Sequence, residues 1–459
     1  MSSRQTWSGG AMAAAVLVLA VLPSARPQGA EKGSGPPTPP GSLEQTVSEL
    51  KARVAVLEQG TARLTKEVEG NASPVPARGA YDDHQEAAPR PNDLTLDPKY
   101  RGFIPVPNTE VMIKFNAKPR VDFTCDPQNT GNDDRFVPAD IPVKGAPARG
   151  GGARFNANGK GSQLSVDVRA PRIAGSPRFY YQNDFFGSGG GNFPYHLQHM
   201  YGQYFNLIAG QTYSVWEDPD VYPDTVDSEG PNAAISGRRP LARYRLPLDD
   251  AWHLNFGVEK PDASADGASE TIHPAPDCAF SARWERTGQG HAQLSSILRL
   301  IAARDAVGEK QTILGWGLNG GIGLDITGND LLQGLLVYGA GIGSLGNDTG
   351  FLSAADAAYD ADGDLRALKY FSALAGFTHH WSEKLRSTIS CGYVNLGNEE
   401  AQDGGAYHRT WYASANLVYQ IIRRMSVGLE GLYGYKQTKD GSSGDAWRAQ
   451  IGLAYSIFD

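Results

Sequence analysis

AWRAQIGLAYSIFD, residues 446–459, ends the chain and alternates large apolar side chains with small or polar ones. The apolar set is Trp447, Ala449, Ile451, Leu453, Tyr455 and Ile457. The intervening set is Gln450, Gly452, Ala454 and Ser456. A period of two is typical of a β-strand. Two structures fit this strand: a half-buried strand of a soluble β-sandwich, or a strand of a transmembrane barrel with its apolar face in lipid and its polar face on a wet lumen.

The start of the chain favours export. Residues 1–25 carry one early positive charge, Arg4, and then the apolar run AMAAAVLVLAVL at 11–22. This run is too short for a membrane-spanning helix and has the length of a signal-peptide core, so we expect a signal peptide over 1–25. No later apolar run reaches the length of a spanning helix. A membrane-embedded chain would therefore be a barrel, because in lipid only helices and closed sheets satisfy every backbone group.

Composition narrows the function classes. The chain has 459 residues, of which 55 are glycine, well above the roughly 7% of an average protein. The formal net charge of −8 argues against a nucleic-acid partner. The three cysteines, Cys125, Cys278 and Cys391, are far apart and have no CxxC spacing. They allow at most one disulfide and do not define a disulfide-framed fold.

A heptad repeat follows the signal peptide. Residues 26–42 form a Pro/Gly-rich linker, and 43–69 contain apolar residues at alternating spacings of four and three. The repeat positions are Leu43, Val47, Leu50, Val54, Leu57, Thr61, Leu64 and Val68. This pattern predicts a short parallel coiled coil, with a single solvated helix as the alternative. Its valine–leucine core leans towards dimers, whereas RVAVLE (53–58) is similar to a trimer-favouring pattern. A Pro-rich tether, 70–108, then leads to one large domain.

The domain over 109–459 divides into sixteen segments with strand character. They are 110–123, 153–169, 178–186, 196–206, 207–216, 234–247, 251–260, 277–286, 291–303, 311–326, 331–344, 367–381, 384–396, 406–420, 424–437 and 445–458. Their connections alternate between long loops and tight turns. This alternation is how outer-membrane barrels are built, and a sandwich has no reason to keep it. The sequence therefore predicts an all-β transmembrane barrel of about 16 antiparallel strands, with Pro119 marking a bulge in the first.

Several motifs carry a resemblance to a known family. They are RFNANGKGSQLSVDVRAP (154–171), RFYYQNDFFG (178–187), GQTYSVWEDPDVYPDTVDSEGPN (210–232) and RRPLARYRLPL (238–248). Together with the order of parts, they resemble the DcaP-like trimeric outer-membrane porins. The closing strand also resembles the carboxy-terminal signal read by the barrel-assembly machinery. The resemblance implies homotrimers of 16-stranded barrels, a periplasmic coiled coil and uptake of small anions, dicarboxylates in particular.

The third long loop, 217–233, carries only negative charges. Its acidic residues are Glu217, Asp218, Asp220, Asp224, Asp227 and Glu229. In porins of this size the third loop folds inward, so we expect these residues to shape a constriction; a loop lying in solvent is the alternative. Positive charges alternate on the polar faces of neighbouring strands. The predicted pore-lining residues are Lys114, Lys118, Arg120, Arg169, Arg239, Arg243, Arg245 and Arg283.

Arginine suits carboxylate because its planar fork bonds two oxygens, and charged rings set the selectivity of a channel. The predicted lining therefore favours anions. The alternative is a weakly selective pore in which Asp122, Asp167, Asp184 and Glu285 neutralise the cations.

No motif in the sequence supports an enzyme, a cofactor or a specific metal site. GWGLNG (315–320) and GIGSLG (341–346) match GxGxxG, but each lies inside a predicted strand with no following helix. The Asp360 loop begins like a calcium loop, yet its sixth and twelfth positions are Leu365 and Phe371. No nucleophile elbow is present. We expect no catalytic residues, no cofactor and no metal ligands.

The sequence thus favours a diffusive porin for small anionic solutes. It would lie in a Gram-negative-type outer membrane, in contact with its lipid, with the coiled coil in the periplasm. Two other functions stay open: a structural barrel that spaces or tethers the envelope through its coiled coil, and an outer-membrane enzyme.

Overall fold

The computed structural model describes residues 100, 102–235, 237–351 and 354–457. The predicted signal peptide and coiled coil, and the tether up to residue 99, lie outside these residues. The chain divides into two units, residues 1–75 and 76–459, and every element below belongs to the second.

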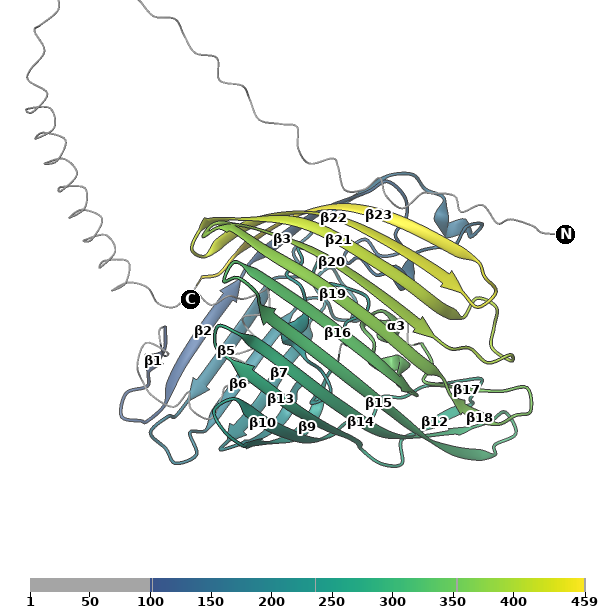
Figure 1. The fold of residues 1–459 in the computed structure, drawn as a ribbon, viewed down its shortest axis with the longest axis horizontal. Helices are drawn as coiled ribbons and strands as arrows, with labels where there is room; N and C mark the ends of the chain where they lie inside the picture. Colours follow the sequence, from purple (N-terminus) through teal and green to yellow (C-terminus); the bar gives the residue numbers. More distant parts are fainter. Residues whose placement is uncertain (1–99, 101, 236, 352–353, 458–459) are drawn as a thin grey trace, which may run out of the picture. The chain divides into compact units, whose positions relative to one another are not determined.

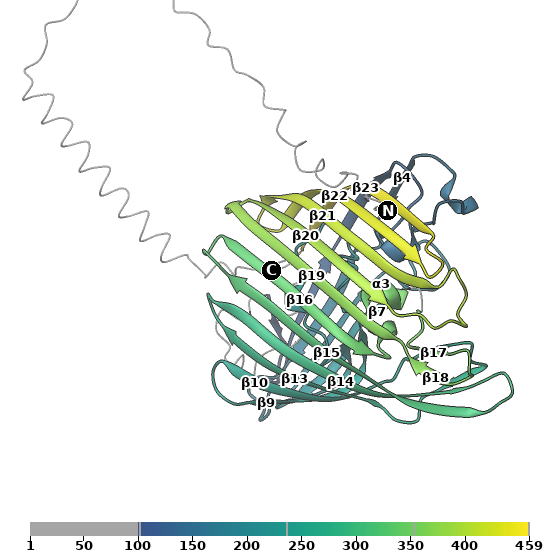
Figure 2. The same cartoon turned by 45° about the vertical axis from the view of Figure 1, so that its right-hand side comes forward.

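One large sheet dominates the described residues, and its long strands run side by side in both views (Figures 1 and 2). Its strands are β1 (Ile104–Pro105), β2 (Met112–Lys118), β3 (Arg120–Asp126), β4 (Arg154–Asn158), β5 (Gln163–Arg169), β6 (Arg178–Asp184), β7 (His196–Tyr204), β8 (Leu207–Tyr213), β9 (Arg238–Pro247), β10 (Trp252–Glu259), β12 (Glu270–Ile272), β13 (Asp277–Arg286), β14 (Gly290–Arg304), β15 (Lys310–Asp325), β16 (Asp330–Ala340), β19 (Lys369–Ser382), β20 (Leu385–Leu396), β21 (Tyr407–Ile422), β22 (Met425–Thr438) and β23 (Ser443–Tyr455). Each of the sixteen segments expected from the sequence overlaps one or two of them.

The long strands pair antiparallel with their neighbours in sequence. The segment expected as the first strand is split at Pro119 into β2, which pairs with β5, and β3, which pairs with β4. Proline lacks the N–H that a ladder needs, which explains the break. At the other end of the chain, β23 pairs antiparallel with β3, with Ile451 opposite Phe123. The first and last long strands are therefore hydrogen-bonded neighbours.

The large sheet exposes its apolar face and buries its polar face, which is the reverse of the arrangement in a soluble protein. In β23, Trp447 and Ile451 are each 46% exposed, whereas Gln450 on the other face is 2% exposed. In β21, Trp411 and Leu417 are exposed, and Ser414 and Asn416 are buried. Soluble proteins rarely expose large contiguous apolar patches. The alternation expected for the closing strand is confirmed, with its apolar set on the exposed face.

Short elements occupy the long connections. The strands β11 (Ala265–Asp266), β17 (Ala357–Tyr359) and β18 (Leu365–Ala367) form a small separate sheet, and β12 pairs with β14. The connection after β16 also holds η5 (Gly343–Leu345) and α3 (Asn347–Phe351). The sequence pattern did not predict these short strands, because two or three residues are too few to show a period. All three cysteines of the chain are free.

Within the residues that the structure describes, no helix is long and apolar enough to cross a membrane.

Candidate functional site

The third long loop, 217–233, lies against the buried face of the large sheet, and its hydrogen bonds show where it runs. Asn319 of β15 donates to the carbonyl of Trp216 just before the loop, at 2.8 Å. Gln333 of β16 donates to the carbonyl of Tyr222, also at 2.8 Å. Further along, Asn232 donates to Thr410 of β21 at 2.8 Å. The loop therefore contacts strands far from β8 and β9, between which it lies in sequence.

Glycines on the buried face leave room for this loop. A Cβ at Gly376 of β19 would lie 2.4 Å from Cγ of Pro223. A Cβ at Gly392 of β20 would lie 2.2 Å from Oδ1 of Asn232. Real Cβ contacts are not this short, so these positions need glycine for steric reasons. Part of the chain's glycine excess thus serves close approach between loop and strand.

Four acidic residues of the loop are held by arginines. Asp218 and Asp220 accept hydrogen bonds from Arg283 of β13 at 3.0 and 2.6 Å. Asp224 is paired with Arg386 of β20. Glu229 lies 2.8 Å from Arg135, which comes from the first long loop and stacks on Phe186. Three guanidinium groups therefore face these four carboxylates and compensate part of their charge.

The other two acidic residues, Glu217 and Asp227, are buried. Burial raises the pKa of Glu217 to about 8, although Arg238 and the Tyr222 hydroxyl offset part of this effect. Burial likewise raises the pKa of Asp227 to about 6, and Arg448 offsets part of it. At neutral pH, Glu217 is therefore mostly uncharged.

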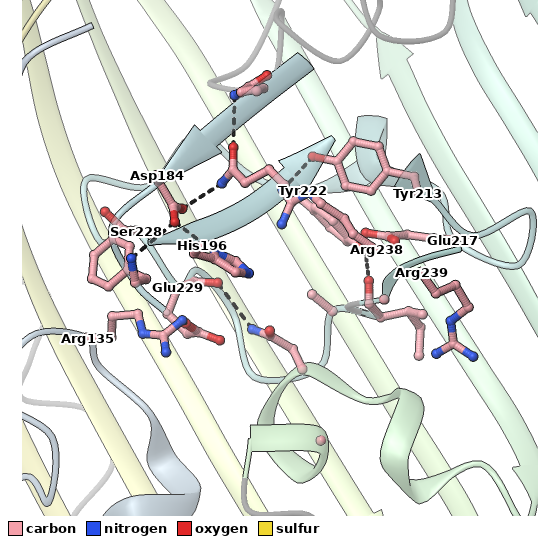
Figure 3. Close-up of a pocket in the computed structure, with 18 of the residues that line it drawn as sticks. Arg135, Asp184, His196, Tyr213, Glu217, Tyr222, Ser228, Glu229, Arg238 and Arg239 are labelled. Carbon is pink, nitrogen blue, oxygen red and sulfur yellow. Dashed lines mark hydrogen bonds and ion pairs between the residues drawn. The ribbon is translucent and has the colours of Figure 1, made fainter. Parts of the chain in front are cut away.

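A cavity of about 590 Å³ lies beside the loop. Its wall includes Gln182 and Gln198, with Asp184 and His196 at one end and Arg238 and Arg239 at the other (Figure 3). Asp184 is bonded to Nδ1 of His196 at 2.7 Å and to Nε2 of Gln198 at 2.6 Å. The region after β16 closes part of the cavity, since Ser344, Gly346, Asn347 and Gly350 also line it. The cavity is thus polar and carries charges of both signs.

Only some of the predicted pore-lining residues line this cavity: Lys118, Arg120 and Arg239 do. Lys114 and Lys118 line a smaller adjoining pocket with Asp167 and Tyr180. Arg283 is the loop anchor described above, which the sequence had not suggested.

Two cations on β2–β5 are paired. Arg120 binds Asp122 at 2.7 Å and the carbonyl of Val226. Arg169 binds Asp167 at 2.7 Å, and Arg178 of β6 binds the same carboxylate at 2.7 Å. The neutralisation considered from the sequence thus has a structural basis for Asp122 and Asp167, and Glu285 lies 3.3 Å from Arg283.

Three of the four arginines of β9, Arg239, Arg243 and Arg245, share one face of that strand, opposite the exposed Tyr244 and Leu246. Arg239 lies between two carboxylates, 3.3 Å from Asp277 and 3.8 Å from Glu259. Arg245 bonds to His253 of β10 at 2.9 Å. Arg243 lies between them along the strand, opposite Gly257 of β10 and Ile208 of β8. Positive charge therefore extends along β9 beyond the cavity.

The sequence reasoning missed Arg238. Because Arg238 directly precedes Arg239, strict alternation would put its side chain on the outer face of the strand. It lines the cavity instead, since it is the first residue of β9 and alternation does not yet hold there. Its Nη2 donates to the Tyr213 hydroxyl at 2.7 Å, and its guanidinium lies 4.6 Å from the centre of that ring. The feature of the sequence that could have identified Arg238 as a cavity residue is the pair of adjacent arginines shortly after an acidic loop.

One group of side chains could offer ligands to a metal ion. The ligand atoms of Asp218, Asp220 and His291 lie within 4.8 Å of one another in the part of the chain that the structure describes. Arg283 donates to both carboxylates, so it already supplies the positive charge that a cation would bring. We therefore interpret these three side chains as part of the contact by which Arg283 holds the third long loop.

Comparison with known proteins identifies relatives of the chain. A family model described as DcaP outer membrane protein matches residues 100–456. No curated protein matches the chain in sequence.

Solved structures share the fold. The outer membrane channel DcaP of Acinetobacter baumannii matches with a TM-score of 0.67 at 19% identity, over 77% of this chain and 99% of that one. The anion-selective porin from Comamonas acidovorans matches with a TM-score of 0.52 at 11% identity, over 76% of this chain and 100% of that one. At these identities the likeness concerns the fold alone.

Proposed function

Because the chain belongs to the DcaP outer membrane protein family, we propose that it is an outer-membrane porin through which small anions, dicarboxylates among them, diffuse passively. The resemblance seen in the sequence is thereby confirmed at the level of the family.

The pore would be a closed barrel of sixteen strands. The pairing of β23 with β3 supports closure, since every other long strand pairs with its neighbours in sequence. The exposed apolar face would meet lipid, and the polar face would line the lumen. A barrel satisfies every backbone group in lipid only when it has no free edge.

The third long loop would narrow the lumen. This is supported by the contacts of the loop with β13, β16 and β21, of which β16 and β21 lie well away from the strands that the loop connects. A loop anchored at several points keeps a fixed constriction, because its backbone carbonyls and carboxylates already have partners.

Compensation of the loop's negative charges is the observation that carries anion preference. Four of its six carboxylates are paired with arginines, and burial favours the neutral form of Glu217. Arg243 and Arg245 continue the positive face of β9 below the cavity. A solute would therefore meet the positive charges of Arg243 and Arg245 and a loop whose negative charge is partly compensated. A ring of side chains with one sign of charge selects for ions of the opposite charge.

The remaining parts of the proposal follow the family resemblance. The chain would form homotrimers, with residues 43–69 as a periplasmic coiled coil, and would be inserted by the barrel-assembly machinery. The alternative is a structural barrel that spaces the envelope through the coiled coil. The two differ in whether the lumen conducts.

Liposome swelling tests the proposed function. Purified full-length protein should admit succinate faster than a neutral sugar of similar size, and a diamine of similar size more slowly than either. Liposomes that admit none of the three would favour the structural barrel. Equal entry of succinate and the diamine would refute anion preference while leaving a general porin.

A further inference from the structure

The chain enters the large sheet through a short hairpin, and β1 lies at the end of the sheet where β2 begins (Figure 1). β1 pairs antiparallel with β2, with Ile104 opposite Ile113. In the turn between them, the amide and the hydroxyl of Thr109 both donate to the carbonyl of Val106, at 3.2 and 2.9 Å. Residues 100 and 102–105, which we call the entry segment, are therefore held against β2, although the sequence pattern placed them in the tether.

Two aromatic rings of the entry segment lie on cations of the sheet. The pairing of β1 with β2 puts Phe103 beside Lys114, on the face opposite to Ile104, which is 62% exposed. The centre of the Phe103 ring lies 5.9 Å from the Lys114 ammonium and 5.2 Å from the Arg169 guanidinium. The Tyr100 ring lies 5.7 Å from the same guanidinium and meets Phe103 edge to face. These distances are typical of cation–π contacts.

The two cations belong to the polar face of the sheet, and the sequence predicted that they line a pore. Lys114 lines the smaller pocket together with Asp167, and Arg169 lies two residues beyond Asp167 on β5. However, Lys114 is only 7% exposed, and the side chain of Arg169 is 12% exposed. Asp167 accepts a hydrogen bond from Arg169 at 2.7 Å, so one carboxylate and two rings cover this guanidinium.

We propose that the entry segment is an aromatic lid on Lys114 and Arg169, and that Tyr100 and Phe103 thereby limit how strongly this end of the lumen attracts anions. The lid rests on the proposed function, since it presumes that anions pass along the polar face of the sheet. In salt solution the attraction between two charges falls steeply with distance, over a Debye length of about 8 Å. A ring that covers the guanidinium keeps a solute farther away and blocks the two hydrogen bonds that an arginine fork can give to a carboxylate.

Few contacts hold the entry segment in comparison with the strands beside it. β1 has two residues, whereas β2 has seven and pairs along its whole length with β5. β3 pairs with β23 without any part of the entry segment. We therefore expect the barrel to assemble when the two rings are removed.

The double variant Tyr100→Ala with Phe103→Ala tests the lid through the reversal potential of the purified full-length protein in a potassium chloride gradient. The ratio of chloride to potassium permeability should rise about twofold above the wild-type value, because both cations become accessible to passing ions. Arg169→Gln should then lower this ratio more in the double variant than in the wild type, where the rings already cover the guanidinium. This difference between the two backgrounds separates a lid on Arg169 from a general change in pore width.

Ile104→Ala is the matched control, because it shortens a side chain of the same segment on the opposite face, and it should keep the wild-type ratio. Phe103→Leu keeps an apolar side chain without an aromatic face and should raise the ratio less than the double variant does. It also tests the lid if the double variant fails to assemble.

A permeability ratio that stays at the wild-type value in the double variant and in Phe103→Leu would overturn the lid. An effect of Arg169→Gln that is equal in both backgrounds would also overturn it. A wild type that is cation-selective, or that does not conduct, would instead overturn the proposed function, so the two failures are distinguishable.

Discussion

Arg283 of β13 holds Asp218 of the third long loop, with Nη1 of the guanidinium 3.0 Å from Oδ1 of the carboxylate. Both side chains are buried, and Nη2 of the same guanidinium lies 2.6 Å from Asp220. His291 of β14 bonds to the second oxygen of Asp218 at 3.1 Å. One residue of β13 therefore fixes the start of the loop that connects β8 and β9.

Arg283→Gln should release this part of the loop. Removing one partner of a buried ion pair costs about 3–5 kcal/mol, because the other charge stays buried and unpaired. We expect a lower thermal midpoint of the purified protein and larger fluctuations of its single-channel current in planar bilayers. Arg366→Gln is the matched control, since its side chain is 54% exposed and pairs with Asp360 at the surface. Equal behaviour of the two variants would contradict the anchoring role.

Gly376→Ala should displace the loop by steric overlap. The added Cβ would lie 2.4 Å from Cγ and 2.9 Å from Cβ of Pro223, whose ring cannot turn away. We expect altered conductance with a barrel that still assembles, because the change lies on the inner face of β19. Gly431→Ala is the control, because a Cβ there meets nothing within 4 Å. Conductance that is the same in both variants would argue against contact between the loop and β19.

Asp348 should make stability depend on pH. It lies in α3 and accepts hydrogen bonds from the backbone of Ala139, from Tyr407 and from Thr410. Burial raises its pKa from an ordinary 3.8 to about 6. A carboxyl with a raised folded-state pKa destabilises the fold once it ionises. The cost is absent below about pH 4, grows between pH 4 and 6, and reaches about 3 kcal/mol above that.

Asp348→Asn should therefore flatten the fall of the thermal midpoint between pH 4.5 and pH 7.5, as followed by the heat-induced shift of the barrel on gels. The hydroxyls of Tyr407 and Thr410 can turn to accept from the new amide. Asp360→Asn is the control, because hydrogen bonds from Arg366 lower the pKa of that exposed carboxyl. A pH dependence that survives in Asp348→Asn would assign the effect to other buried carboxyls, such as Asp227.

Ile457→Asp should reduce insertion into the outer membrane. Ile457 is on the exposed face at the end of the chain, in line with Tyr455. An acidic residue on the lipid face of a barrel costs less than a basic one, and less near the rim than at the midplane, where basic residues cost about 2–4 kcal/mol. Tyr455→Ser should have a similar but smaller effect, and Ala454→Ser on the other face should have none. Normal outer-membrane levels of Ile457→Asp and Tyr455→Ser would contradict a role of this row of side chains in insertion.

The strand pattern was readable from the sequence because it depends on local alternation alone. The alternating faces of β23 and the common face of Arg239, Arg243 and Arg245 follow from a period of two. The break at Pro119 follows from the missing N–H of proline. Arg238 escaped this reasoning, since alternation does not hold at the first residue of a strand.

Partners across the sheet were not readable from one sequence. Arg283 and Asp218 are far apart along the chain, and several other acidic residues could have met the same arginine. The need for glycine at Gly376 likewise appears only once Pro223 lies against it. Alternation predicts the face of the strand on which a residue lies. Which side chains contact each other across the sheet depends on the path of the long loop.

Replacing three arginines of β9 tests the central claim most directly. Exchanging Arg239, Arg243 and Arg245 for glutamine removes three positive charges per chain and keeps the polarity of these positions. Their fields act over a Debye length of about 8 Å at physiological salt, which includes any solute passing along β9. The reversal potential of the purified protein in a potassium chloride gradient reports the ratio of anion to cation permeability. We predict an anion-selective potential for the wild type and a potential near zero or of opposite sign for the triple variant, with conductance within about twofold. A cation-selective wild type, or an unchanged potential in the triple variant, would contradict the account.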